Sequence, residues 1–122
     1  MLTVRQKMLI ETDLMEHFGL NVFQYKLLVT IQENEKLWNQ QEKKWYYSPR
    51  GWCHLSKKML AAKLSVKPRY VFNAIQHLLN KKGFNLLDKY EKNPSLIATN
   101  LRWKELRAEA EKNEIQKCKV IL

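Results

Sequence analysis

The chain of 122 residues is 45% hydrophobic and 28% charged, contains only 3 Gly and 3 Pro, and carries a net charge of +10. This composition is typical of one folded, mainly helical domain, and it argues against disorder and against a linker-rich array. Charges at Arg5, Lys7 and Glu11 interrupt the first apolar residues. They exclude a signal peptide and a membrane span, so we expect a cytoplasmic protein.

The positive charge is concentrated in the middle of the chain. Residues 1–42 hold four basic and six acidic residues, a balance of −2, and residues 91–122 hold seven and five, a balance of +2. Residues 43–90 hold eleven basic residues and one acid, a balance of +10. Because Lys and Arg that face phosphates release condensed counterions, this distribution predicts a nucleic-acid partner. A membrane-surface helix needs an apolar face turned to the lipid, and the apolar residues here are required for a core, so we expect no membrane partner.

In chain order, residues 1–20 are predicted to form an N-terminal arm. Residues 7–12 have the pattern of a short strand or extended segment, and Asp13 is placed to cap a brief helix over residues 15–18 that stops at Gly19. A longer helix then begins after Asn21, and one of its faces is apolar. We expect it to be the central core helix, with an apolar face made of Val22, Phe23, Leu27, Leu28, Ile31, Leu37 and Trp38.

The segment of residues 45–52 combines aromatic and basic side chains. Its Ser-Pro-Arg-Gly run predicts a type I turn, followed by a hairpin or by a short strand over residues 52–55. Aromatic residues interleaved with cations can stack the bases of single-stranded nucleic acid, or they can pack against the helix that contains Phe23. The residues concerned are Trp45, Tyr46, Tyr47 and Trp52, beside Lys43, Lys44 and Arg50.

Residues 56–84 contain two short helical patterns separated by a tight connection. Ser56 is placed as the N-cap of the first helix, which has its apolar positions at Met59, Leu60 and Leu64. After residues 65–67, Pro68 starts the second helix, because its ring presets a helical backbone angle and a first turn does not need its missing N–H. Gly83, after two lysines, is expected to end that helix in a left-handed conformation. The apolar residues of the second helix recur at intervals of three and four: Val71, Ala74, Ile75 and Leu78.

These two helices resemble the helix-turn-helix of winged-helix DNA-binding proteins. That family's pattern of Leu-Ala, Leu, Val, Val, Ala-Ile and Leu is matched here by Leu60-Ala61, Leu64, Val66, Val71, Ala74-Ile75 and Leu78. The resemblance implies a mainly α fold of the α+β type, in which a small β-hairpin wing follows the helix-turn-helix within a single domain over residues 1–122. Two residues depart from the pattern. Lys67 is a poor N-cap, and Phe72 is a large apolar residue at an exposed position, where it packs on the wing or on a partner.

Residues 85–101 are predicted to form the wing. Its strands cover residues 85–91 and 96–101, and alternation along the second strand leaves one face for the helices and a solvated tip at residues 92–95. Residues 103–118 have the pattern of a charged helix with a single apolar stripe at Trp103, Leu106 and Ala110, which caps the fold or mediates weak pairing. The apolar residues 120–122 are expected to dock on this chain or on a neighbouring one.

The resemblance implies that the helix of residues 68–82 enters the major groove of double-stranded DNA. The residues predicted to read bases lie opposite its apolar face: Lys67, Arg69, Tyr70, Asn73, Gln76 and His77. Contacts to the DNA backbone are expected from Lys57, Lys58, Lys63, Lys81 and Lys82, and contacts from the wing to an adjacent groove from Lys89, Lys92 and Asn93. Arg69 suits a bidentate contact with guanine, and Asn73 or Gln76 one with adenine. The alternative for each of these residues is an ordinary solvated surface position.

The sequence offers little support for a metal site or for catalysis. His17, His54 and His77, taken with Cys53 and Cys118, show no zinc-ligand spacing, so we expect no metal and no cofactor. The two cysteines are expected to be reduced thiols, with Cys53 a small core residue. There are only two Asp residues, no Gly-rich phosphate loop and no nucleophile with a supporting His, so an enzyme is not expected.

Three functions agree with these observations. The first is a sequence-selective, double-stranded-DNA-binding transcriptional regulator that binds as a homodimer at a two-fold operator. The second is a replication initiator or origin-binding protein of the phage or plasmid type, because the opening arm, the Gly-Leu-Asn-x-Phe run at residues 19–23 and the Trp-rich segment are similar to small replication proteins with winged helices. The third is a protein-interaction module that docks a polypeptide through Phe72 or through the C-terminal segment.

Overall fold

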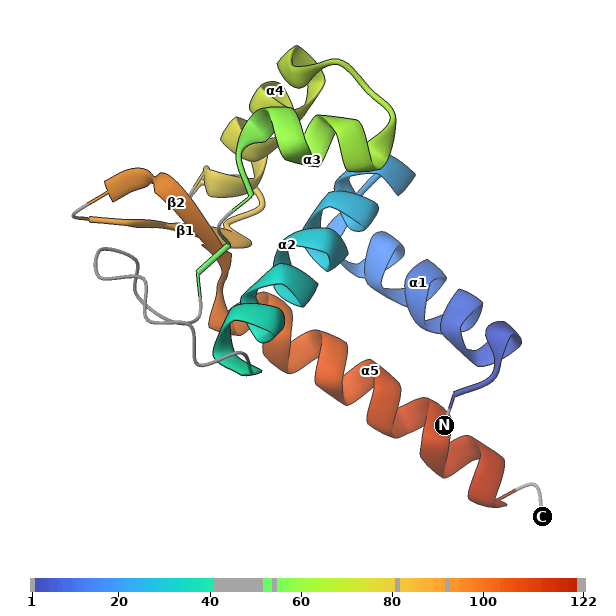
Figure 1. The fold of residues 1–122 in the computed structure, drawn as a ribbon. Coiled ribbons are helices and arrows are strands. Elements are labelled where there is room, and N and C mark those ends of the chain that lie inside the picture. The colour runs from blue at the N-terminus through green and yellow to red at the C-terminus, as the bar shows by residue number, and fades with distance from the viewer. Residues whose placement is uncertain (1, 41–51, 54, 81, 92, 121–122) are drawn as a thin grey trace.

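The computed structural model describes residues 2–40, 52–53, 55–80, 82–91 and 93–120. Within these residues the fold is mainly helical, with five helices and one antiparallel β-hairpin (Figure 1). In chain order the elements are α1 (Val4–Phe18), α2 (Val22–Gln40), α3 (Lys57–Leu64), α4 (Pro68–Leu79), β1 (Leu87–Tyr90), β2 (Asn93–Thr99) and α5 (Leu101–Val120).

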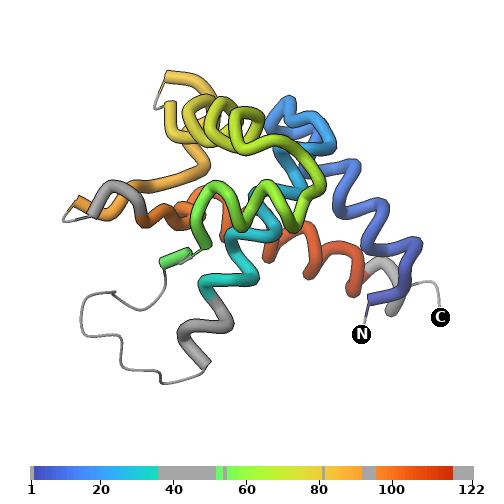
Figure 2. The backbone as a smooth tube through the Cα atoms, turned by 45° about the horizontal axis from the view of Figure 1, so that its top comes forward, coloured from blue at the N-terminus to red at the C-terminus, as the bar shows by residue number. Residues whose placement is uncertain are grey.

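Helix α2 lies at the centre of this arrangement. It contacts α1, α3, α4 and β2, whereas α5 packs against α1. Both views show the hairpin on the side of α2 away from α1, and the start of α1 near the end of α5 (Figures 1 and 2). Leu27, Leu28 and Ile31 of α2 are fully buried, which confirms the prediction of a central core helix. Val22 is exposed instead, because it lies nine positions before Ile31, about two and a half turns, which places it on the opposite face.

The prediction of a strand over residues 7–12 is wrong, because the N-terminal arm is the helix α1. The side chain of Thr3 accepts a hydrogen bond from the backbone N–H of Gln6, and the side chain of Gln6 accepts one from the backbone N–H of Thr3, so the two residues form a capping box. Every fourth residue is buried, from Gln6 through Ile10 and Leu14 to Phe18. Gly19 ends α1 in a left-handed conformation with φ 69°, as predicted for the shorter helix.

Asn21 caps α2 as the sequence predicts. Its side-chain oxygen accepts the backbone N–H of Gln24 at 2.7 Å, and the Gln24 side chain accepts the Asn21 N–H at 3.0 Å. The side chains of Leu37 and Trp38 lie outside the described residues, as do residues 41–51 with the predicted turn.

Helices α3 and α4 form where the sequence predicts them, with one error of phase. Ser56 caps α3 by accepting the backbone N–H of Met59 at 3.2 Å. Met59 itself is 55% exposed, so its assignment to the apolar face is wrong. The face that packs in the core instead comprises Leu60, Ala61 and Leu64, which are spaced by one turn.

Helix α4 has the predicted buried face but ends earlier than predicted. Val71, Ala74, Ile75 and Leu78 are all buried, and Lys67 makes no side-chain capping bond. The last helical residue is Leu79 rather than residue 82, because the Asn80 side chain accepts the backbone N–H of Lys82 and offers the chain a turn in place of another helical bond. Gly83 is not left-handed; the left-handed residue of this turn is Asn85, with φ 50°.

The hairpin forms after α4 in antiparallel register, with Leu87 opposite Thr99 and a bulge between Lys89 and Tyr90. Its strands differ from the predicted bounds, since β1 starts later and β2 starts earlier and ends before residue 100. The expected alternation is also wrong, because every residue from Leu96 to Thr99 is buried. Helix α2 packs on β2, and Ile97 faces Leu60 of α3 and Ile75 of α4 across a small pocket. The edges of β2 are paired by β1 and by Cys53, whose backbone N–H donates to the carbonyl of Ile97 at 2.8 Å. In the described part of residues 52–55, this single bridge at Cys53 stands in place of the predicted strand.

A buried carboxylate attaches the hairpin to the helices. Glu35 of α2 accepts hydrogen bonds from the backbone N–H of Thr99 at 2.5 Å and from its hydroxyl at 3.0 Å. The ammonium of Lys104 in α5 lies 3.3 Å from the same carboxylate. Burial raises the pKa of Glu35, while the hydrogen bond from the Thr99 backbone and the charge of Lys104 act in the opposite direction. One side chain of α2 therefore holds both the end of β2 and the first turn of α5.

Helix α5 starts two residues before the predicted helix, with the Asn100 side chain accepting the backbone N–H of Trp103 at 3.1 Å. The predicted stripe is confirmed: Trp103 is fully buried, and Leu106 and Ala110 pack against the core. The indole N–H of Trp103 donates to Gln32 of α2 at 2.9 Å. Residues 121–122, which belong to the apolar end expected to dock on a chain, lie outside the described residues.

Candidate nucleic-acid interface

The residues predicted to read bases lie on the surface of α4. The buried face of α4 turns toward the core, and the other side of the helix is solvent-exposed. All six predicted residues are exposed, with Lys67 directly before the first turn: Lys67, Arg69, Tyr70, Asn73, Gln76 and His77. The structure therefore places the six residues on one accessible helix surface.

The predicted backbone contacts border that surface from α3 and from the turn after α4. Lys57, Lys58 and Lys63 are exposed on α3, which packs against α4, and Lys82 is exposed in the turn. Lys89 is exposed on β1, the strand in contact with α4. Lys81, Lys92 and the side chain of Asn93 lie outside the described residues.

The charge of this surface is of one sign over a long stretch of sequence. From residue 56 to residue 87 the chain contains seven basic residues and no Asp or Glu. Charges that share a surface add their potentials over about a Debye length, roughly 8 Å at physiological salt. The packing of α3 against α4 therefore brings basic residues of this stretch close together into a positive surface, and β1 adds Lys89 beside the exposed Asp88.

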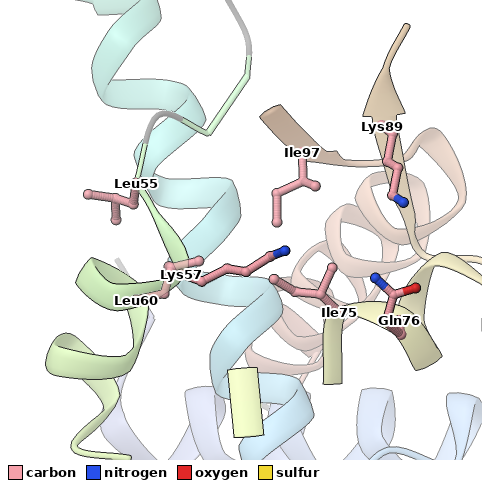
Figure 3. Close-up of a pocket in the computed structure, with 7 residues that line it drawn as sticks. All are labelled: Leu55, Lys57, Leu60, Ile75, Gln76, Lys89 and Ile97. Carbon is pink, nitrogen blue, oxygen red and sulfur yellow. The ribbon is translucent and has the colours of Figure 1, made fainter. Parts of the chain in front are cut away.

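A small pocket opens where α3, α4 and the hairpin meet (Figure 3). Its volume is about 50 Å³. The apolar part of its wall comes from Leu55, Leu60, Ile75 and Ile97, and the polar part from Lys57, Gln76 and Lys89. Figure 3 shows the ends of the two lysine side chains and the Gln76 amide turned toward the same space from three different elements. No sequence pattern predicts this convergence, because the lining residues are spread over more than forty positions.

Phe72, which was expected to pack on the wing or on a partner, has a neighbour in α3. Its ring is 45% exposed and lies under the ammonium of Lys57, 4.5 Å from the nitrogen to the ring centroid. This is the geometry of a cation–π contact. Phe72 thus contributes to the position of a lysine on the positive surface.

The aromatic segment before α3 is described only at its end. Trp52 is half-buried and its ring lies 5.2 Å from that of Tyr90 in β1. Trp45, Tyr46 and Tyr47, for which base stacking and core packing were the alternatives, lie outside the described residues.

Behind the surface, Cys53 is a buried free thiol, as expected of a small core residue. Burial raises the pKa of the Cys53 thiol to about 11. No three His, Cys, Asp or Glu side chains among the described residues gather as metal ligands. None of the helices in the described part of the chain is long and apolar enough to cross a membrane.

Comparisons of the chain with protein-family models, with curated proteins and with solved structures found no match.

Proposed function

We propose that the protein binds double-stranded DNA with sequence selectivity, with α4 in the major groove and the hairpin acting as a wing. In this proposal α3 and α4 form a helix-turn-helix, and the order α3, α4, β1, β2 is that of a winged helix. The observation that carries the proposal is the exposed face of α4, which displays basic and amide side chains while the opposite face is buried in the core.

The exposed side chains suit the chemistry of DNA. Arg69 lies in the first turn of α4, the part of a recognition helix that approaches base edges, and its guanidinium matches the two acceptors of guanine. Asn73 lies one turn further along, with an amide that matches adenine. Lys58 and Lys63 of α3 supply charge for backbone phosphates on the flank of that contact. A transcriptional regulator that acts in the cytoplasm as a homodimer at a two-fold operator is the role that we propose.

A second candidate function is docking of a polypeptide on the same surface. Three large side chains with apolar surface are exposed there, Met59, Tyr70 and Phe72, and such groups anchor protein interfaces. A polypeptide held by apolar contacts binds with little dependence on salt, whereas a DNA complex loses affinity steeply as salt rises.

The experiment that tests the proposal is selection of bound sequences from a pool of random duplex DNA at two salt concentrations. We expect enrichment of a defined site and a steep decrease of affinity at the higher salt. A site with two-fold symmetry supports a dimeric regulator, and asymmetric or repeated sites support a replication initiator instead. Failure to enrich any site, with equally weak binding at both salts, contradicts DNA binding and favours the polypeptide.

Variants of the α3–α4 surface assign the contacts. Arg69→Ala is expected to relax the sequence preference and to cost about 1–3 kcal/mol at the selected site. Lys58→Ala is expected to weaken all sequences alike and to flatten the salt slope by about one. Lys112→Ala, which removes the same charge from an exposed position on α5, serves as the control and should leave binding unchanged. If the Arg69 and Lys58 variants bind like the control, the surface is wrongly assigned.

A further inference from the structure

We propose that the pocket between α3, α4 and β1 holds one phosphodiester of the DNA backbone, gripped jointly by Lys57, Gln76 and Lys89. This inference rests on the proposed function and changes the roles within it. The sequence assigns Lys57 to the backbone, Gln76 to a base and Lys89 to a separate groove. In the structure the three side chains line the same pocket (Figure 3).

The polar lining of the pocket favours the binding of an anion. Two ammonium groups approach one space of about 50 Å³, and among the described residues neither lysine forms a salt bridge. Like charges that share a site repel each other, and an anion placed between them converts that repulsion into two attractions. The Gln76 amide adds an N–H donor at the same opening.

The apolar lining selects a phosphodiester among anions. Leu60, Ile75 and Ile97 form a buried aliphatic wall that has nothing to offer a free inorganic phosphate. A backbone phosphodiester carries deoxyribose carbons on both sides of its charged oxygens, so it presents apolar and anionic surface together. The aliphatic wall also lowers the local dielectric, which strengthens the attraction between the phosphate and the two ammonium groups.

Phe72 positions one arm of this clamp. Its ring holds the Lys57 ammonium at 4.5 Å, and Gln76 follows one turn later on the same helix. A lysine side chain loses rotational freedom when it binds, and a cation–π contact that restricts it beforehand reduces that loss. This gives the exposed aromatic ring a role that does not require a further protein.

A phosphate held from three elements fixes the register of the complex. Phosphate contacts set how a protein sits on the duplex, and base contacts then read the sequence. Because Gln76 belongs to α4 and Lys89 to β1, the same phosphate positions the base-reading face of α4 and the hairpin together.

The test replaces each backbone phosphate of the selected duplex in turn by an uncharged methylphosphonate. At one position the wild-type protein is expected to lose about tenfold in affinity, the effect of one charged hydrogen-bonded contact. That sensitivity is expected to disappear in the double variant Lys57→Gln/Lys89→Gln. The double variant Lys58→Gln/Lys82→Gln has the same net charge but leaves the pocket intact, so it should keep the sensitivity at that position. All four lysines are exposed, and melting curves check that both variants fold like the wild type.

Three outcomes overturn the clamp. The first is a double variant at the pocket that keeps the wild-type sensitivity at every phosphate. The second is that the single variants Lys57→Gln and Lys89→Gln abolish the effects of two different phosphates, which means that the lysines act separately. The third is binding of inorganic phosphate at the pocket, seen in the amide signals of the lining residues, without any sensitive position in the duplex. If the wild-type protein selects no duplex, both the proposed function and the proposed phosphate site are refuted. If it selects a duplex and any of these three results follows, only the phosphate site is refuted.

Discussion

Glu35→Ala removes the carboxylate that attaches the hairpin to the helices. Glu35 is 3% exposed, and its oxygens accept the backbone N–H and the hydroxyl of Thr99, which is also buried. Alanine leaves both Thr99 groups without this acceptor and leaves Lys104 without its partner. Because Thr99 ends β2, we expect the loss to loosen the hairpin that carries Lys89 on its other strand.

The magnitude follows from the number of groups left without a partner. An unsatisfied buried polar group costs about 1–3 kcal/mol, and Thr99 has two. The Thr99 hydroxyl can rotate toward another acceptor, and the Lys104 side chain is 41% exposed and can be solvated by water. The total cost therefore stays below the upper end of that range for two groups. We therefore expect Glu35→Ala to lower the free energy of unfolding by about 2–4 kcal/mol.

Glu35→Gln is the matched control, because it keeps the shape and one oxygen that can accept the Thr99 N–H. Its free energy of unfolding is expected to stay within about 1 kcal/mol of the wild type, since a neutral side chain no longer pays the desolvation of a buried charge. Urea unfolding followed by circular dichroism measures all three proteins. Equal losses for the Ala and Gln variants, or an Ala variant within about 1 kcal/mol of the wild type, would refute the role of these hydrogen bonds.

The wild type and Glu35→Gln together test the pKa of Glu35, which burial raises above its ordinary value of 4.5. A raised pKa means that the folded state binds the proton more tightly than the unfolded state does. The stabilisation from this proton is fully present below pH 4.5 and is lost as the pH rises through the higher pKa of the folded state. The stability of the wild type relative to Glu35→Gln should therefore fall as the pH increases above 4.5. A difference that is constant with pH contradicts this assignment.

Two further predictions concern the core around the surface. Ile75→Ala, at a buried position of α4, is expected to lower the free energy of unfolding by about 2–5 kcal/mol because it leaves a cavity. Met59→Ala, at an exposed position of α3, is expected to lower it by less than about 0.5 kcal/mol. Equal losses in urea unfolding would refute the packing described for α3 and α4. Cys53 is 1% exposed and its pKa is raised to about 11, so at mildly alkaline pH we expect the native protein to be alkylated at Cys53 much more slowly than the urea-unfolded chain. Mass spectrometry of the Cys53 peptide measures both rates, and similar rates would contradict its burial.

The helical part of the fold was predictable where apolar spacing and caps agreed. In α4 the four apolar residues at positions 71, 74, 75 and 78 define a single face, and Pro68 marks the start, so bounds and phase at this end were right. In α1 the pattern was obscured, because buried Gln6 is polar while Met8 and Leu9 are apolar and exposed. In α3, with only eight residues, one exposed apolar side chain was enough to shift the predicted face.

The candidate site was predictable only where it depends on one helix. Exposure of the residues predicted to read bases follows directly from the buried face of α4, and the structure agrees with that exposure. The pocket depends instead on how β1 and α3 meet α4, and no local pattern encodes that meeting. The burial of consecutive residues of β2 was missed for the same reason, because the contacts that cover the strand come from α2 and from Leu60 and Ile75, far away in the sequence.

The hydrogen bonds that tie α2 to the hairpin and to α5 have a consequence for the order of folding. Glu35 and Thr99 are separated by 64 positions, and Gln32 and Trp103 by 71. Helices α3 and α4 pack together across a connection of only three residues, so they form contacts without closing a long loop. Closing a long loop costs chain entropy before any packing offsets it. The contact between α4 and β1 is also local, because only residues 80–86 separate them. The positive surface is therefore built from neighbouring segments of the chain, and the step that closes long loops is the attachment of the hairpin and α5 to α2.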